Sequence, residues 1–235
     1  MWKEFKTYYR NDSSQLSEEW FSIRLCSLTA GNSGNWSGRS NFAKSPDEEA
    51  DYICGLKIKS FDDKNKYNMN NGIIGEPELR KWDSQLLGIP LSEVGVSVWK
   101  ENPIFRGSLD AEPNIKLEDN YDFFCEYKIT QDDVYRPLIE YTESIKKGYK
   151  PPPFYHNHIF SSHYDQMTVN GIIHDRKYCH YVVKGFKTNN IYWENIPINK
   201  DHWEKELYPK GLLFYDNYII PRMKEHNLKR IDPNI

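Results

Sequence analysis

A hydrophobic segment at residues 123–129 carries a carboxylate and an ammonium group two positions apart. Because side chains alternate between the faces of a β-strand, Glu126 and Lys128 project from the same face, beside Phe124. The opposite face is apolar throughout and consists of Phe123, Cys125, Tyr127 and Ile129. We therefore expect a strand over residues 122–130 whose apolar face packs in the core and whose other face holds the charged pair.

The preceding segment, residues 103–111, repeats this alternation. Its polar face consists of Arg106, Ser108 and Asp110. If the two strands pair as a hairpin through a turn at residues 112–121, Asp110 approaches Glu126. Neighbouring carboxylates raise each other's pKa unless a cation lies between them, and Mg²⁺ prefers oxygen ligands. A lone Glu-x-Lys pair usually faces solvent, but the added Asp110 makes the pattern more specific, and it predicts a Mg²⁺ site in which Mn²⁺ can substitute.

Capping and breaking residues locate the first helices. Ser17 is a suitable N-cap followed by acidic residues, and the helix it begins is expected to end near residues 31–38. Pro77 is well placed at the first turn of a second helix, which begins at Glu76 and ends at Gly88. Residues 60–71 are polar and are predicted to form an exposed loop.

Hydrophobic periodicity indicates the remaining elements. We expect strands at residues 94–100, 177–184 and 190–193, a helix at 161–174, and a helical tail at 201–228 that breaks near 209–211. This order predicts an α/β (α+β) fold with a mixed central β-sheet flanked by helices. A length of 235 residues suits a single domain spanning residues 1–235.

Composition narrows the functional class. The net charge of −3 argues against a strongly basic nucleic-acid coat protein, although a local basic groove can still bind DNA. The chain has no apolar run of about 20 residues and no signal peptide at its start, so we expect a soluble intracellular protein without a membrane partner. The four cysteines form no CxxC pair and are expected to be buried free thiols.

Several motifs together resemble a known family. Asp110 with Glu126-Tyr127-Lys128 resembles the Asp…(Asp/Glu)-x-Lys signature of the restriction-endonuclease-like nuclease superfamily. Residues 19–30 resemble the opening helix of the lambda-exonuclease / YqaJ-type viral recombinase nucleases. Residues 75–80 look like that family's Gly-x-Glu-Pro-x-x-Arg helix, and residues 164–167 look like its Tyr-x-x-Gln helix. These motifs occur in the family's order over residues 18–185.

The resemblance implies roles for individual residues. Asp110 and Glu126 would ligate the metal together with the Tyr127 carbonyl and the carboxylate of Glu76. Lys128 would orient or deprotonate the attacking water, and as a base it would need a pKa lowered by burial. Gln166 would hold Lys128 or the water.

A phosphate site is implied beside the metal. Arg24 and Ser108 would bind the phosphate. The chain departs from the family in having Thr29-Ala30-Gly31 where Thr-Ala-Ser is usual, so Ser33 would replace one phosphate contact beside Thr29. Ser108-Leu109-Asp110 replaces the usual Ser-Pro-Asp but keeps the acid. Without the resemblance, Arg24 could be a surface ion pair and Glu76 a helix-start acid.

The activity that the resemblance implies is a Mg²⁺-dependent DNA exonuclease that degrades one strand 5′→3′ from duplex ends, in viral or phage recombination and repair. Such nucleases often act with a single-strand annealing protein and can form ring-shaped homo-oligomers; a viral protein would work in the cytoplasm or nucleus of its host. The alternatives are a structure- or sequence-specific endonuclease of the same superfamily, a non-catalytic DNA-binding protein on this scaffold, and an unrelated α/β domain.

Overall fold

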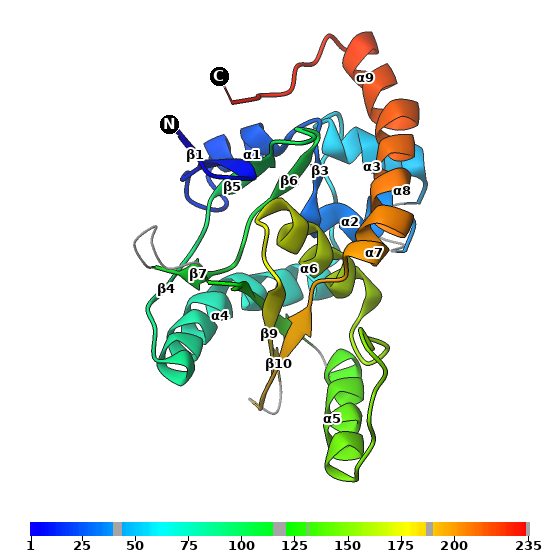
Figure 1. The fold of residues 1–235 in the computed structure, drawn as a ribbon. Helices are drawn as coiled ribbons and strands as arrows, with labels where there is room; N and C mark the ends of the chain where they lie inside the picture. The colour runs from blue at the N-terminus through cyan, green and yellow to red at the C-terminus, as the bar shows by residue number, and fades with distance from the viewer. Residues whose placement is uncertain (40–43, 115–120, 131, 187–189, 234–235) are drawn as a thin grey trace.

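The computed structural model describes residues 1–39, 44–114, 121–130, 132–186 and 190–233, which form two larger β-sheets surrounded by helices (Figure 1). The first sheet has five strands in the order β1-β2-β5-β6-β3. These strands are Trp2–Glu4, Tyr8–Asn11, Val96–Trp99, Phe105–Gly107 and Leu28–Thr29, respectively. All neighbours pair antiparallel except β3 and β6, which are parallel, so the sheet is mixed.

The second sheet carries the charged strand predicted from the sequence. Its order is β10-β9-β8, from Ile191–Pro197 through Tyr178–Gly185 to Phe123–Thr130. β8 pairs parallel with β9, and β9 pairs antiparallel with β10. A short third sheet joins β4 (Leu91–Ser92) to β7 (Glu112–Pro113). The α/β fold with mixed sheets flanked by helices is therefore confirmed, although the strands divide into separate sheets.

The predicted hairpin between residues 103–111 and 122–130 is wrong. β6 ends at Gly107 and belongs to the five-stranded sheet, whereas β8 belongs to the three-stranded one. After β6 the backbone bonds elsewhere, since the Val94 N–H donates to the Leu109 carbonyl over 3.3 Å. A single antiparallel bridge, Ala111 to Cys125, joins the two segments. Residues 115–120 of the predicted turn lie outside the described residues.

Helix α1 (Glu18–Arg24) begins as predicted, because the Ser17 side chain accepts a hydrogen bond from the Trp20 N–H. It ends well before residues 31–38, since Cys26 adopts a positive φ of 53°. The chain then forms β3, a 3₁₀ turn at Ala30–Asn32 and the short helix α2 (Ser33–Trp36).

Helix α4 (Asp63–Leu87) is longer than predicted. It starts at the Asp62 N-cap rather than at Glu76, so much of the predicted loop at residues 60–71 is helical. Pro77 lies within the helix at an exposed position, where water can reach the Ile73 carbonyl that Pro77 cannot bond. Gly88 ends the helix as expected, with a left-handed φ of 70°.

Helix α6 (Ser161–Ile173) confirms the predicted helix at residues 161–174 and lies between the two larger sheets (Figure 1). It contacts β5 and β6 on one side and β8 and β9 on the other. Two helices were not predicted: α3 (Pro46–Ile53) and α5 (Asp132–Lys146).

The C-terminal helical region is continuous from Lys200 to Glu225. It comprises α7 (Lys200–His202), a π-helical turn (Trp203–Leu207), α8 (Tyr208–Phe214), a second π-helical turn (Tyr215–Ile219) and α9 (Ile220–Glu225). The predicted break near residues 209–211 is therefore wrong. Pro209 and Pro221 are the second residues of α8 and α9, and each helix directly follows a π-helical turn. The wider hydrogen-bond pattern of the π-helical turn accommodates the N–H group that proline lacks.

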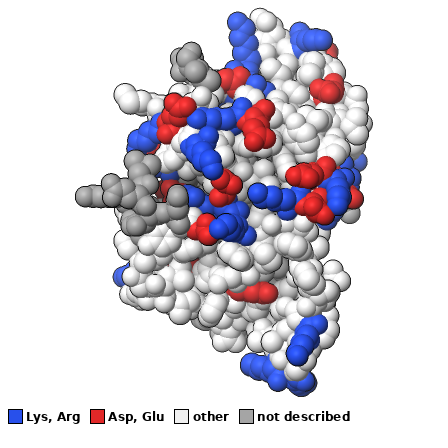
Figure 2. Space-filling model, viewed as in Figure 1, with Lys and Arg blue, Asp and Glu red and all other residues white. Residues whose placement is uncertain are grey.

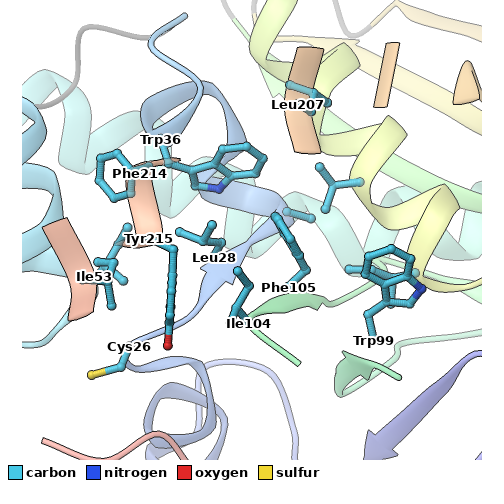
Figure 3. Packing of buried hydrophobic residues seen from close by; sticks show 14 of the residues in the cluster. Cys26, Leu28, Trp36, Ile53, Trp99, Ile104, Phe105, Leu207, Phe214 and Tyr215 are labelled. Atoms are coloured by element: carbon cyan, nitrogen blue, oxygen red, sulfur yellow. The ribbon is translucent and has the colours of Figure 1, made fainter. Parts of the chain in front are cut away.

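The largest core cluster packs the five-stranded sheet against the C-terminal helices. Figure 3 shows Leu28 and Phe105 from the sheet between Trp36, Phe214 and neighbouring side chains. A second cluster packs Phe124 of β8 against α6 and α5. All four cysteines are buried and free, as predicted. Within the described part of the chain, no helix is both long and apolar enough to span a membrane.

Candidate active site

Glu126 is the most buried carboxylate of the site. It is 0% exposed in the middle of β8, and three side chains donate to it. Lys128 and the Gln166 amide donate to Oε1, while the Asn170 amide donates to Oε2 over 3.5 Å. Burial, followed by the nearby charge of Asp110, raises the pKa of Glu126 to about 8 against the opposing effect of Lys128. Glu126 is thus a buried carboxylate whose negative charge is only partly compensated.

Asp110 reaches the same point from the other sheet. Its Oδ2 accepts a hydrogen bond from the Tyr127 backbone N–H over 2.8 Å, which places the Asp110 carboxyl beside β8. Burial raises the pKa of Asp110, against the opposing effect of Lys128. The expected approach of Asp110 to Glu126 is therefore present, but it arises from the loop after β6 and not from a hairpin.

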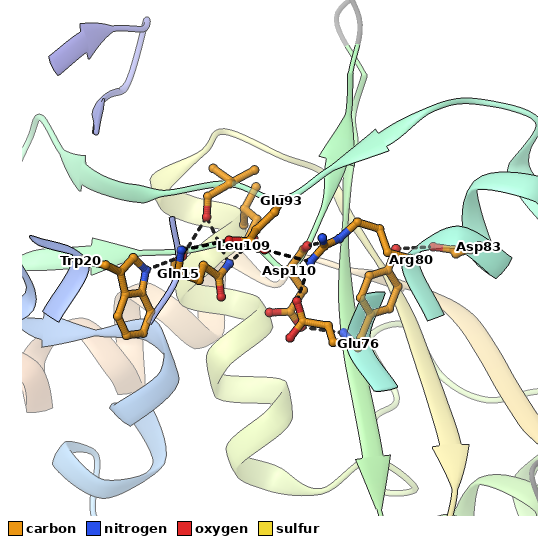
Figure 4. A network of polar contacts seen from close by, with 11 residues as sticks. Gln15, Trp20, Glu76, Arg80, Asp83, Glu93, Leu109 and Asp110 are labelled. Carbon is orange, nitrogen blue, oxygen red and sulfur yellow. Dashed lines mark hydrogen bonds and ion pairs between the residues drawn. The ribbon is translucent and has the colours of Figure 1, made fainter. Parts of the chain in front are cut away.

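Glu76 lies on α4 and completes the acidic group. Figure 4 shows Arg80 between Glu76, one helical turn away on the same helix, and the Asp110 backbone. The Arg80 Nη2 lies 2.7 Å from Glu76 Oε1, and its Nε donates to the Asp110 carbonyl over 3.1 Å. Burial, followed by the charge of Asp110, raises the pKa of Glu76 to about 7. The motif at residues 75–80 thus places two charged side chains, Glu76 and Arg80, at the site.

The pKa of Lys128 differs from what a general base requires. Burial alone would lower it, but Glu126 and Asp110 outweigh burial, so the pKa of Lys128 lies above its ordinary value. The ammonium group donates directly to Glu126. Of the two predicted roles, this arrangement therefore suits Lys128 to orient a nucleophile as a cation rather than to remove its proton.

The donor set fits a divalent cation held partly by water. Asp110, Glu126 and Glu76 bring three carboxylates together against the cations of Lys128 and Arg80, and their raised pKa values show that added positive charge would be favourable. In the described residues, no cluster of three or more Asp, Glu, His or Cys side chains is close enough to ligate one ion. Mg²⁺ commonly binds through one or two carboxylates and retains several waters, which this arrangement permits.

A small cavity of about 140 Å³ adjoins Asp110. It is lined by three of the residues predicted to bind phosphate, Arg24, Thr29 and Ser108, and by the predicted catalytic residues Asp110 and Gln166. It also contains Gln15 and Trp20, to which the sequence had given no role. The Gln15 amide donates to the Val94 and Leu109 carbonyls, and the Trp20 indole N–H donates to Ser108 Oγ over 3.3 Å.

Two cations line this cavity, Arg24 and Arg106, and Arg106 pairs with Asp232. The Arg24 guanidinium stacks on the Trp20 ring with its Cζ 3.7 Å from the ring centroid, and it donates to Thr29 Oγ1 over 3.3 Å. Burial lowers the pKa of Arg24 to about 10. None of the ion pairs among the described residues involves Arg24. A half-buried guanidinium that lines a cavity and has no carboxylate partner among the described residues is suited to bind an anion such as a phosphate.

The last residue predicted to bind phosphate, Ser33, lies away from the cavity. Ser33 is buried in α2 with its hydroxyl unpaired, and it does not line the cavity. A larger groove of about 1330 Å³ lies between the β1–β2 hairpin and residues 174–178, and it contains none of the predicted site residues.

Comparison with known proteins identifies the fold. The sequence matches neither a known protein-family profile nor any curated protein sequence. Solved structures of similar fold include an alkaline exonuclease from Laribacter hongkongensis, with a TM-score of 0.62, 19% identity, and coverage of 90% of this chain and 96% of that one. The same enzyme in complex with dAMP gives a TM-score of 0.60 at 19% identity, covering 90% and 98% of the two chains.

A phage-related exonuclease from Haemophilus somnus 129PT is also similar, with a TM-score of 0.54, 14% identity, and coverage of 84% of this chain and 96% of that one. This chain therefore shares its restriction-endonuclease-like fold with exonucleases over nearly their whole length. At these identities the similarity concerns the fold.

Proposed function

We propose that this protein is a metal-dependent DNA exonuclease that hydrolyses phosphodiester bonds at duplex ends. The observation that carries the proposal is the cavity at Arg24, which is lined by Asp110 and by Gln166, the residue that donates to Glu126. Phosphodiester hydrolysis requires an anion receptor beside groups that activate water, and the two are adjacent here. The fold shared with exonucleases, one of them solved with the nucleotide dAMP, supports this choice among phosphate-processing reactions.

The metal would be Mg²⁺, with Mn²⁺ as a substitute, held by Asp110, Glu126 and the Tyr127 carbonyl, with Glu76 contributing through a bound water. When bound, it would activate water and stabilise charge on the phosphate and the leaving oxygen. Lys128 and Gln166, both bonded to Glu126, would orient the attacking water.

The cavity would hold the terminal phosphate. Arg24 would bind it through two parallel hydrogen bonds, with Ser108 and Thr29 donating their hydroxyls. A terminal 5′-phosphate held there would give 5′→3′ digestion of one strand. Charges of both signs mix on the face shown in Figure 2, so on this face DNA would be bound through local contacts rather than by a broad basic surface.

The proposed biological role is viral or phage recombination and repair in the cytoplasm or nucleus of a host cell. A single-strand annealing protein and further copies of this chain are the proposed partners.

The test is a cleavage assay on matched substrates. Linear 5′-phosphorylated duplex and closed circular duplex are incubated with Mg²⁺ or with EDTA, and the Lys128→Ala variant serves as the control. Mg²⁺-dependent loss of the linear duplex alone is expected, reduced about 100-fold or more in the variant. Cutting of the circle would replace the exonuclease with an endonuclease, and cleavage of neither substrate would overturn the proposed function.

A further inference from the structure

Asn170 is a buried polar residue on the α6 face that meets β8, one helical turn beyond Gln166. It is 0% exposed. Its Nδ2 donates to Glu126 Oε2 over 3.5 Å and to the Ser108 carbonyl over 3.4 Å. The Ser108 carbonyl can only accept a hydrogen bond, so the orientation of the amide is fixed: the reversed amide would set its oxygen against the carbonyl oxygen. Gln166 and Asn170 thus donate to different oxygens of one carboxylate.

The two partners of Asn170 belong to different sheets. Ser108 directly follows β6 of the five-stranded sheet, while Glu126 lies on β8 of the three-stranded sheet. Near the site, the backbones of these segments are joined at the single bridge between Ala111 and Cys125. The Asn170 amide therefore connects the segment that lines the cavity to the strand that carries Glu126.

The backbone around Asn170 is held from both sides. The His174 Nδ1–H donates to the Asn170 carbonyl over 2.8 Å, and the second ring nitrogen of His174 bonds Ser97 of β5. On β6, Gly107 leaves room for the amide, since a Cβ there would lie 2.6 Å from Asn170 Oδ1. The amide is thus confined to one position between the sheets.

The oxygen of this amide has no hydrogen-bond partner among the described residues, although it is buried. An unpaired buried acceptor lowers stability, so the oxygen of Asn170 contributes nothing to folding. What an apolar residue cannot supply is the donor to Glu126 and Ser108. The contacts therefore favour a role in the site over a role in folding.

We propose that Asn170 is a positioning residue of the site: its amide fixes Glu126 relative to the phosphate-binding segment at Ser108, and so sets how tightly the divalent cation is bound. This inference rests on the proposed function. Asn170 does not touch the reacting atoms; it acts through Glu126, as residues that orient metal-binding carboxylates do.

The test measures metal affinity directly. Binding of Mn²⁺ to the full chain is followed by titration calorimetry for the wild type, Asn170→Ala and Asn170→Leu. The Leu variant keeps the shape of the side chain and removes both polar groups, so it guards against loss of folding. Both variants are expected to weaken Mn²⁺ binding about 10-fold or more.

Cleavage of linear duplex in Mg²⁺ provides the second measurement. The kcat of both variants should fall about 10- to 100-fold, whereas the KM for DNA should change little because Arg24 still binds the phosphate. The matched control is Asn11→Ala, which removes another buried Asn amide whose partners are Glu19 and Ser13. This variant should leave both the Mn²⁺ affinity and kcat unchanged.

The outcomes separate this inference from the proposed function. A wild type that binds Mn²⁺ and cleaves DNA, together with Asn170 variants that match Asn11→Ala in affinity and kcat, would overturn the positioning role alone. A wild type that neither binds Mn²⁺ nor cleaves DNA would overturn the proposed function and the positioning role with it.

Discussion

Burial of His174 makes the stability of the protein depend on pH. This imidazole lies just after α6 and is 1% exposed. Its Nδ1–H donates to the Asn170 carbonyl, so its Nε2 accepts from the Ser97 hydroxyl over 2.8 Å. Burial, together with the cations Arg176 and Arg10, lowers its pKa from 6.5 to about 3 against the opposing effect of the Asn170 carbonyl.

The direction of this pH dependence follows from the number of protons that the folded and unfolded chains bind. Between pH 6.5 and 3 the unfolded chain binds a proton at His174 that the folded chain does not, so stability falls as the pH falls through this range. Each pH unit below 6.5 costs about 1.4 kcal/mol. At pH 5.0, about 1.5 units lower, His174 should therefore reduce the free energy of unfolding by about 2 kcal/mol, while at pH 7.5 its effect is close to zero.

The assay compares urea unfolding of the wild type and His174→Gln at pH 7.5 and pH 5.0. The glutamine cannot titrate and can still bond Ser97. The wild type should lose about 2 kcal/mol more than the variant between the two pH values. His163, whose pKa burial also lowers to about 3, is present in both proteins and cancels. Equal losses in the two proteins would refute the argument.

Three further substitutions test other contacts. Gly107→Ala places a Cβ 2.6 Å from Asn170 Oδ1 and should lower the free energy of unfolding by about 1–3 kcal/mol in urea denaturation. Asp232→Asn removes the carboxylate that lies 2.7 Å from the buried Arg106, and thermal unfolding should show a loss of about 2 kcal/mol, less than for a fully buried pair because Asp232 is 42% exposed. Arg24→Gln should abolish a preference for 5′-phosphorylated over 5′-hydroxyl duplex ends, measured as the ratio of initial cleavage rates.

The two stability predictions have matched controls. Gly72→Ala adds a Cβ that meets no atom within 4 Å in the helix α4, so it should not destabilise; if it costs as much as Gly107→Ala, the close contact is not the cause. Asp201→Asn removes an exposed carboxylate paired with Lys205 and should change stability by less than about 0.5 kcal/mol. An Arg24→Gln enzyme that still distinguishes the two ends would exclude Arg24 as the receptor of the terminal phosphate.

Local sequence signals predicted the elements whose ends are set by neighbouring residues. Ser17 caps α1 through Trp20, three residues away, and Gly88 ends α4 through its own backbone conformation. The first half of α4 was missed because its Asn-rich sequence has no clear apolar face. It is held partly by tertiary contact, since Gly75 packs against Ile129 of β8.

The site was predictable where local backbone geometry alone places the side chains. Glu126 and Lys128 share a strand face, so the alternation of side chains was enough to place them together. The pairing of their strand was not predictable, because it depends on contacts distant in sequence, and the assumed hairpin proved to be a single bridge. Trp20 escaped notice because its partner, Ser108, is 88 residues away. Asn170 could have been found by its spacing of one turn from Gln166.

The central claim is that Asp110 and Glu126 hold a divalent cation beside the cavity at Arg24. Crystals of the wild type and of Glu126→Gln grown with MnCl₂ test it most directly, through the anomalous scattering of manganese. We predict a peak in ligating contact with the carboxylate oxygens of Asp110 and Glu126 in the wild type, much weaker in the variant. No peak at these carboxylates at saturating Mn²⁺, or an undiminished peak in Glu126→Gln, would contradict the account.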